Sequence, residues 1–403
     1  MRPKILILVV LISSVLGCQH ATSELDQGLW LLTFHLDNGH DLPVNVEVGS
    51  DGTLTFVNAE ERVSMEQPIY QGDSVYIMHP VFEGYFKGKL QEGELEGVFV
   101  KESLDRIVPF NMIKGDYPRF QSSPADFTAV SGRWESVFSP DSDEDRYPAM
   151  GLFSQTGDQV EGTFRTTTGD YRYLQGIMDG DSLKLSTFDG AHVFLFEAHV
   201  RDSLMEGVFY SGNHWVEPFT ARLNPVYELP DPLGLTGLKE GWETLAFSFP
   251  DEQGQMISLA DPQFEDQVVV VQLMGSWCPN CLEESRFYAS YNKQHRDRGL
   301  KFVALAFEYA PDQERAWKGL NRLKEKLQIE YPILLAQYGS SDKEEAAAKL
   351  PMLDHVLSYP TTLFIDRKGE VRRIHTGING EATGRFESFQ EDFDLFVQGL
   401  LNE

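Results

Sequence analysis

Two cysteines, Cys278 and Cys281, stand three positions apart in the segment Trp277-Cys-Pro-Asn-Cys281. Two thiols at this spacing can close into a disulfide and open again, which is the chemistry of thiol-disulfide exchange. The spacing of the two cysteines therefore predicts a redox-active pair, and the residues around it must show whether the chain positions it for that use.

A zinc site is the alternative use of a C-x-x-C pair. The whole chain contains 3 cysteines, so histidines would have to complete the set of ligands. The candidates show no ligand spacing of their own; they are His295, His355 and His375. We therefore expect redox chemistry and no metal.

The residues around the pair predict a strand followed by a helix. Residues 267–274 form an almost unbroken β-branched and apolar run, which is typical of a buried parallel strand. Gly275-Ser276 then turns the chain into a helix, so Cys278 falls at the helix N-terminus. Free backbone N–H groups and the helix dipole stabilise a thiolate there. We expect Cys278 to be the attacking sulfur and Cys281, one turn further on, the resolving thiol.

The two residues between the cysteines form the active-site turn. Pro279 falls at the first helical position, where its missing N–H is no loss and its fixed φ suits the turn. Asn280 follows it. The Pro-Asn dipeptide tunes the reduction potential, and the sequence leaves the direction of electron flow open.

Pro360 stands directly before the apolar segment 361–365, a place where a cis X-Pro bond is a structural device. With the cysteine pair, this makes residues 240–403 resemble the thioredoxin fold, and specifically the TlpA/ResA-like disulfide reductases related to the AhpC/TSA group. The resemblance implies that Tyr359 and Pro360 form a loop that faces the pair. It also implies that this loop, with Trp277, binds the substrate peptide.

The rest of this region has the order of elements that an α/β thioredoxin-like domain requires. The patterns predict a strand over 301–307, a helix over 312–327, a strand over 332–336, a hairpin through 366–369 and a closing helix over 386–401.

A carboxyl group for proton transfer is implied by the same resemblance. Thioredoxin carries a buried Asp six residues before its first active-site cysteine, and here that position is Gln272. The TlpA/ResA-like reductases share a Glu three residues after the second cysteine, and Glu284 matches it. Spacing of three places Glu284 on the helix face of Cys281, where it would serve the resolving step. The family's proline two residues later is Arg286 here, and a solvated Glu284 beside Glu283 is the alternative.

A peroxiredoxin is the enzymatic alternative within the AhpC/TSA group. Peroxide reduction uses a P-x-x-x-T/S-x-x-C arrangement. Counting back from Cys281, the hydroxyl position holds Cys278 and the proline position Met274; counting back from Cys278 gives Gly275 and Val271. Neither cysteine has the required neighbours.

The N-terminus predicts export and lipid attachment. A basic start is followed by the apolar run 5–15 and by Val15-Leu-Gly-Cys18, which resembles a lipobox. Residues 1–17 are thus predicted as a lipoprotein signal peptide and Cys18 as the lipidated residue. The run is too short to span a bilayer of roughly 30 Å. A plain secretory signal is the alternative. We expect a lipid-anchored protein of the bacterial envelope that faces the periplasm, with inner versus outer membrane left open.

Composition bounds the possible partners. The formal net charge of −28 argues against nucleic acid and against electrostatic attraction to anionic lipid, so attachment would rest on acyl chains. The 403 residues at 41% hydrophobic suffice for two or three domains.

The region before residue 240 is all β in pattern and repeated. Residues 24–130 and 131–223 share motifs at offsets of about 104 to 110 residues. The matching pairs are Gly28-Leu-Trp30 with Gly132-Arg-Trp134, Gly72-Asp-Ser74 with Gly180-Asp-Ser182, Glu96-Gly-Val-Phe99 with Glu206-Gly-Val-Phe209, and Pro109-Phe110 with Pro218-Phe219. Short alternating runs between Asp-Gly and Gly-Asp turns predict two antiparallel units, each a barrel or a sandwich. Residues 224–239, rich in proline, are the expected linker.

Three roles stay open for this β region: a spacer, a docking surface for the client protein, or a small-molecule barrel. Its tryptophans are expected in the core; they include Trp30, Trp134 and Trp215.

The sequence thus predicts an envelope thiol-disulfide oxidoreductase that reduces the disulfides of extracytoplasmic proteins, possible clients being apocytochromes. Its redox group would be the Cys278–Cys281 disulfide, with no other cofactor. The resemblance implies re-reduction by a membrane electron donor of the DsbD or CcdA kind. The alternatives are a disulfide oxidase or isomerase, and a binding lipoprotein whose dithiol senses redox state.

Overall fold

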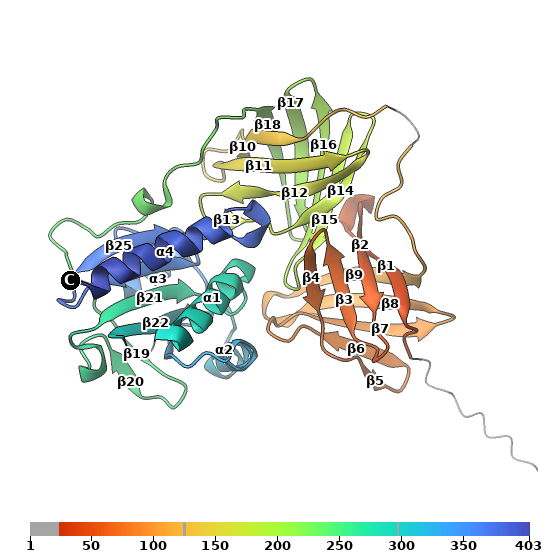
Figure 1. Ribbon diagram of the computed structural model, residues 1–403. Coiled ribbons are helices and arrows are strands. Elements are labelled where there is room, and N and C mark those ends of the chain that lie inside the picture. Colours follow the sequence, from red (N-terminus) through yellow and green to blue (C-terminus); the bar gives the residue numbers. More distant parts are fainter. Residues whose placement is uncertain (1–23, 124–125, 296–297) are drawn as a thin grey trace, which may run out of the picture.

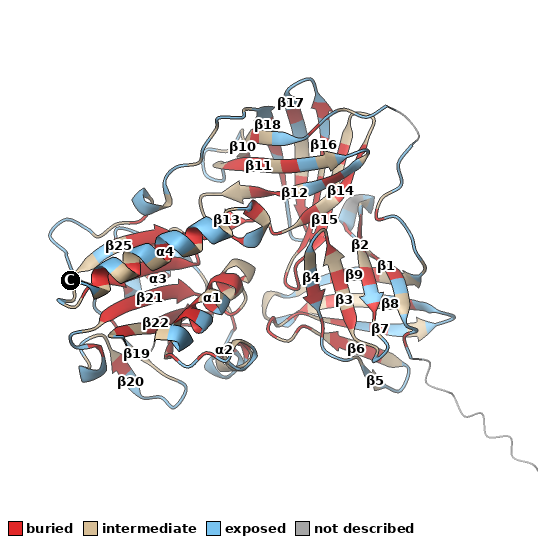
Figure 2. Ribbon diagram, viewed as in Figure 1, coloured by how far each residue is buried: buried red, intermediate tan, exposed pale blue. Residues whose placement is uncertain are grey.

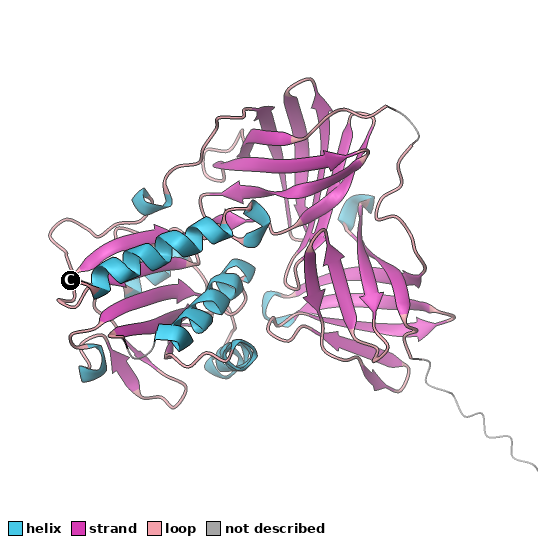
Figure 3. Cartoon of the chain, in the orientation of Figure 1, coloured by secondary structure: helices cyan, strands magenta, loops and turns pink. Residues whose placement is uncertain are grey.

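The computed structural model of the chain describes residues 24–123, 126–295 and 298–403. The predicted signal peptide and Cys18 lie outside these residues. Two β modules are followed by a C-terminal α/β domain, which holds the long helices (Figures 1 and 3). None of the helices in the described ranges has the length and apolar character that a membrane span requires.

The first β module is an open antiparallel sheet with the order β4-β3-β2-β1-β9-β8-β7-β6-β5, curved into a half-barrel. Its strands are β1 Gly28–His35, β2 Asp41–Val48, β3 Leu54–Asn58, β4 Glu61–Ser64, β5 Ile69–Gln71, β6 Ser74–Met78, β7 Tyr85–Gln91, β8 Glu94–Lys101 and β9 Arg106–Lys114. Alternate residues point into its core, as in β3, where Leu54, Phe56 and Asn58 are buried.

The second β module closes into a barrel, because β11 pairs with both β10 and β12. Its strands are β10 Gly132–Phe138, β11 Tyr147–Thr156, β12 Gln159–Thr166, β13 Gly169–Asp170, β14 Leu174–Asp179, β15 Ser182–Phe188, β16 Val193–Arg201, β17 Leu204–Ser211 and β18 Trp215–Leu223. The prediction of an all-β region of two repeats is confirmed, with one repeat closed and the other open.

The two β modules share a core, which the repeat pattern did not predict. Phe188 of β15 is fully buried among aromatic rings of the first module, with its ring centroid 4.5 Å from that of Phe56 and 5.2 Å from that of Phe99. The buried amide of Asn58 in β3 also donates to the backbone carbonyl of Phe188 (3.0 Å). The barrel of the second module therefore covers the apolar face that the half-barrel leaves open.

One tryptophan differs from the expectation of core positions. Trp30 and Trp134 are buried, but Trp215 is 44% exposed. Trp215 is the first residue of β18 and pairs with Ser211 next to the β17–β18 turn, where the following residue, Val216, is exposed as well.

The C-terminal domain is a five-stranded sheet with the order β23-β22-β21-β24-β25. Its elements are β21 Val268–Met274, α1 Pro279–His295, β22 Leu300–Phe307, α2 Gln313–Leu327, β23 Ile333–Gln337, α3 Lys343–Lys349, β24 Thr361–Ile365, β25 Val371–Thr376 and α4 Phe386–Leu401. β21 is parallel to β22 and antiparallel to β24, and α1 packs on α4 through Phe287 and Phe393 (ring centroids 5.1 Å apart). Every residue of β21 is buried (Figure 2).

The elements predicted between the two motifs are present, with ends that differ by at most one residue. Two additional elements are α3 and a hairpin of β19 Ser248–Pro250 with β20 Met256–Ser258. The second half of the segment 224–239 packs on the α/β domain. Leu238 forms a β-bridge with Leu353, and the hydroxyl of Thr376 donates to that of Thr236 (3.0 Å).

Both β modules also contact the α/β domain directly. Val81 and Phe82, in the loop between β6 and β7, are buried in the same apolar cluster as β21, and so is Ala191 of the second module. The chain is therefore a packed assembly of three parts.

The shared β core gives the first testable prediction. Phe188→Ala should lower the free energy of unfolding by about 3 to 5 kcal/mol, because it opens a cavity in a buried aromatic cluster. The loss of stability should be concentrated in the half-barrel, although Phe188 belongs to a strand of the barrel. Amide hydrogen exchange would show faster exchange in β1–β9.

Phe153→Ala is the matched control, because Phe153 packs in the barrel's own core against Phe164. It should speed exchange in the barrel and leave β1–β9 protected. Equal effects of the two variants on β1–β9 would show that the half-barrel does not depend on Phe188.

Candidate active site

Cys278 and Cys281 are joined as a disulfide at the first turn of α1. Cys278 is 6% exposed and Cys281 is fully buried, so an incoming sulfur can reach Cys278 more easily. The backbone N–H of Cys281 points to the Sγ of Cys278 (3.1 Å). An N–H donor at a helix N-terminus stabilises a thiolate, which favours Cys278 as the nucleophile of the reduced pair.

The turn that leads into the pair is held from the sheet side. The backbone N–H and the hydroxyl of Ser276 donate to the buried carboxyl of Glu308 (2.7 and 2.8 Å). The indole N–H of Trp277 donates to the carbonyl of Phe307 (3.0 Å). Burial raises the pKa of Glu308 to about 7, against the hydrogen bonds from Ser276, which lower it. β22 thus fixes the position of Trp277 beside Cys278.

The loop before β24 faces the pair, as the resemblance implies. The Tyr359–Pro360 peptide bond is cis. The carbonyl oxygen of Tyr359 lies 3.6 Å from the Sγ of Cys278, and its ring packs edge-on against Trp277 (centroids 5.9 Å apart). The predicted substrate-contacting residues Trp277, Tyr359 and Pro360 therefore lie together around Cys278.

Glu284 is fully buried, which contradicts the alternative of a solvated side chain. Its carboxylate accepts hydrogen bonds from the amide of Gln272 (2.8 Å) and from the hydroxyls of Tyr288 (3.1 Å) and Thr362 (3.2 Å). Burial raises the pKa of Glu284 to about 7, and the three hydrogen bonds oppose that rise. Glu284 is thus a carboxyl that exchanges a proton near neutral pH, one helical turn from Cys281.

Sequence reasoning missed the partners in this network. Gln272 replaces the buried Asp of thioredoxin, and the structure places its amide directly on Glu284. Its position six residues before Cys278 was a signal of this contact. Tyr288 lies four residues after Glu284 on α1, a spacing that also brings side chains together. Thr362 comes from β24 and had no local signal.

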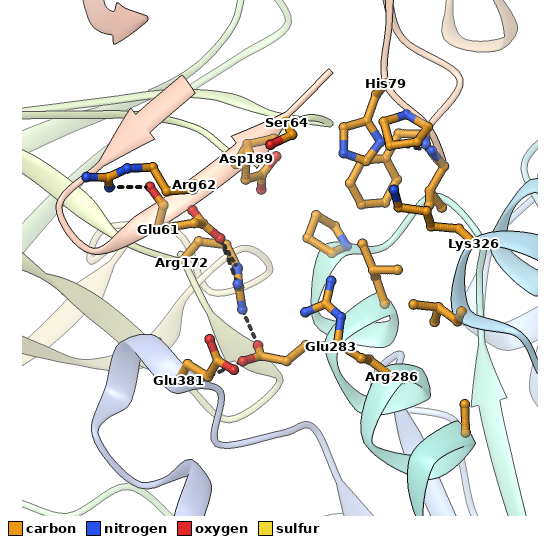
Figure 4. A pocket seen from close by; sticks show the side chains of 18 of the residues that line it. Glu61, Arg62, Ser64, His79, Arg172, Asp189, Glu283, Arg286, Lys326 and Glu381 are labelled. Atoms are coloured by element: carbon orange, nitrogen blue, oxygen red, sulfur yellow. Dashed lines mark hydrogen bonds and ion pairs between the residues drawn. The ribbon is translucent and has the colours of Figure 1, made fainter. Parts of the chain in front are cut away.

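A buried ion cluster joins α1 to both β modules beside the site, and it too was missed (Figure 4). Arg172 follows β13 and makes ion pairs with Glu283 of α1 and with Glu61 of β4 (2.7 Å to Glu61). The carboxyl of Asp170 is buried beside them and accepts from the backbone N–H of Gly380 (3.2 Å). Burial raises the pKa of Asp170 to about 6 and also raises that of Glu61, whereas Arg172 lowers both.

The C-terminal part of the chain is similar in sequence to known proteins. Residues 239–389 match the Redoxin family model. The thioredoxin-like protein YneN of Bacillus subtilis is 29% identical over 35% of this chain and 74% of its own length. The thiol-disulfide oxidoreductase ResA of the same organism is 23% identical over 37% of this chain and 74% of its own. A solved thiol:disulfide interchange protein of Chlorobium tepidum shares 22% identity over 40% of this chain and 95% of its own, with a TM-score of 0.30.

The disulfide at the start of α1, the match to the Redoxin family model and the Bacillus relatives together define the C-terminal domain as thioredoxin-like. The protein is a thiol-disulfide oxidoreductase that resembles the TlpA/ResA-like proteins.

The raised pKa of Glu284 predicts a specific dependence of stability on pH. An acid whose pKa is higher in the folded chain stabilises the fold below its unfolded pKa of 4.5, and this stabilisation is lost as the pH rises to about 7. The wild type should therefore lose about 3 kcal/mol relative to Glu284→Gln over this interval. Urea unfolding of both oxidised proteins at several pH values measures the difference.

The comparison uses the change with pH, so a constant offset caused by the amide does not affect it. Glu325→Gln is the control, because Glu325 is exposed on α2 and should follow the wild type. Parallel curves for Glu284→Gln and the wild type would exclude a buried carboxyl that titrates near neutrality.

Proposed function

We propose that this protein is a lipid-anchored reductase of the bacterial envelope that reduces disulfides of extracytoplasmic proteins. The observation that carries the proposal is the unequal burial of the bonded cysteines at a helix N-terminus, with Cys278 reachable and Cys281 enclosed. This asymmetry suits one sulfur to attack the client and the other to resolve the intermediate.

The reaction balances as a two-electron exchange. The Cys278 thiolate attacks one sulfur of the client disulfide, which forms a mixed disulfide and releases one client thiolate. The Cys281 thiolate then attacks the Sγ of Cys278, which forms the Cys278–Cys281 disulfide and releases the second client thiolate. The two client thiolates each take up a proton, and the dithiol has lost two electrons.

The surrounding residues have separate parts in this scheme. The backbone of Tyr359 and Pro360, with the ring of Trp277, contacts the client at Cys278. Pro279 and Asn280 shape the turn between the cysteines. Glu284 takes the proton of the Cys281 thiol and returns it, a task that its pKa of about 7 supports. The redox-active disulfide is the proposed cofactor, with no other needed.

The sequence before residue 24 supports the envelope location. Lipidation at Cys18 after removal of residues 1–17 would hold the chain at a membrane with its redox domain in the periplasm. The clients would be disulfide-containing envelope proteins, with apocytochromes as one class. A membrane donor of the DsbD or CcdA kind would return the electrons.

The reduction potential of the Cys278/Cys281 couple tests the direction of electron flow. A reductant should show a value near the roughly −270 mV of thioredoxin. The full chain would be equilibrated in dithiothreitol and glutathione buffers and its thiols trapped by alkylation. A value near about −120 mV would make the protein an oxidase and overturn the proposed direction.

Lipidation is tested by labelling cells with radioactive palmitate. The wild-type chain should take up the label, and Cys18→Ala should lose it completely. The double variant Cys278→Ser/Cys281→Ser is the control and should keep the label. Label that persists in Cys18→Ala would refute the lipid anchor.

A further inference from the structure

A hairpin of the second β module, the barrel, lies over one side of the redox site. It consists of residues 165–172, which include the end of β12, the turn at Thr168 and the short strand β13; we call it the cover hairpin. In Figure 1, β13 lies beside the ends of α1 and α4 that face the barrel. The following contacts show what the hairpin covers.

The tip of the cover hairpin lies on the cis-proline loop. The hydroxyl of Ser358 donates to the carbonyl of Thr168 (3.0 Å). The backbone of Thr168 also packs against Gly377, where an added Cβ would lie 2.9 Å from the carbonyl carbon of Thr168. Gly377 in turn donates its N–H to the carbonyl of Pro360 (2.8 Å). The barrel's backbone therefore lies against this loop, next to the Tyr359 and Pro360 backbone that our proposed function assigns to the client.

The cover hairpin also contacts the turn between the cysteines. The amide of Asn280 donates to the carbonyl of Asp170 (3.2 Å). At Gly169 the backbone has φ +148° and approaches Asn280 so closely that a Cβ would overlap its side chain. Only glycine fits this close approach without a shift.

Ion pairs and a hydrogen bond hold the two ends of the cover hairpin in place. Arg172 reaches Glu283 on α1 and Glu61 on the first module, and its side chain is 10% exposed. At the other end of the hairpin, the guanidinium of Arg165 donates to the side-chain oxygen of Asn379 (2.5 Å). Breaking a buried ion pair by removal of one partner is strongly destabilising, since the other charge stays buried. Loss of the Arg172 guanidinium would thus leave Glu61 and Glu283 buried without their counter-charge and would disfavour the docked hairpin.

A pocket of about 540 Å³ remains between the barrel and Cys278. It is lined by Trp277 and Cys278 on one side and by barrel residues such as Tyr171, His192 and Phe194 on the other. This volume lies in the range of small-molecule sites, roughly 300 to 1,000 Å³. It suits a compact disulfide, whereas an extended polypeptide also needs the loop face that Thr168 occupies.

We propose that the cover hairpin sets the size of the substrate. In the docked state it excludes polypeptide from the cis-proline loop and admits small disulfides to Cys278 through the pocket; protein disulfides react when the hairpin is displaced. This inference rests on the proposed function and uses the same two-electron exchange with either substrate.

The test compares a small and a protein disulfide in single turnovers of the reduced full chain. The substrates are hydroxyethyl disulfide and insulin, and the main variant is Arg172→Asn. Asparagine tolerates the left-handed backbone of Arg172 (φ +58°) and removes the guanidinium. The rate with insulin should rise at least about tenfold, the change that 1.4 kcal/mol represents, while the rate with hydroxyethyl disulfide stays within about twofold.

Arg222→Ala is the control, because Arg222 lies in the same barrel and makes an exposed ion pair with Glu135. It should change neither rate. An unchanged rate with insulin in folded Arg172→Asn would overturn the cover hairpin and leave the proposed function intact. Failure of the wild type to reduce either substrate would instead overturn the proposed function.

A second measurement does not depend on the folding of Arg172→Asn. In Cys281→Ser, the free thiol of Cys278 would be alkylated with iodoacetamide or with a maleimide on a long polyethylene glycol chain. Relative to the urea-unfolded chain, the large reagent should be slowed at least about tenfold more than the small one, a difference of 1.4 kcal/mol. Equal slowing would show that Cys278 is open to large substrates and would overturn the proposal.

Discussion

The burial of β21 on both faces is the constraint on which the redox site depends. All seven of its residues are buried, and its two edges pair with β22 and β24, so the strand can present reactive groups to a substrate only where it ends. In open α/β sheets, ligands bind at the carboxyl ends of such strands. Cys278 lies four residues beyond the end of β21, where α1 begins, and so combines a helix N-terminus with access to solvent.

Two adjacent carboxyls on α1 are buried by this arrangement, and they are stabilised in different ways. Glu284 is surrounded by neutral donors from its own domain, and protonation can remove its charge near neutral pH. Glu283 faces the β modules and is paired with Arg172. Because an unpaired buried charge is costly, the pairing of Glu283 with Arg172 links the redox domain to the barrel. Of these two neighbouring carboxyls, Glu284 thus has a pKa raised toward neutrality within its own domain, whereas Glu283 links that domain to the barrel.

Local patterns were enough to predict the site but not its surroundings. The apolar run before Cys278 and the C-x-x-C spacing are local patterns that the sequence shows directly. Pro360 is predicted because it stands at the place that the known order of elements requires. The contact of Arg172 with Glu283 spans 111 residues, and periodicity indicates that a residue is buried without naming its partner. Phe188 shows the same limit. Alternation with Leu183 and Leu185, which lie in the barrel core, places Phe188 on the outer face of the barrel, and no local pattern indicates that the core of the half-barrel receives it. The strands β19 and β20, three residues each, are too short to show a period.

The two repeats explain how a duplicated unit acquired unequal tasks. Strand order and shared motifs make β3 and β4 equivalent to β12 and β13, and β5 equivalent to β14. In the second repeat β14 pairs with β12, which closes the barrel; in the first, β5 and β4 are opposite edges of an open sheet. The open sheet needs cover, and Phe188 from the closed copy supplies it. The equivalent hairpins then meet at one ion pair, with Glu61 in β4 and Arg172 just after β13. The hairpin of the closed copy therefore contacts the redox domain through Arg172, and Glu61 of the open copy pairs with the same arginine.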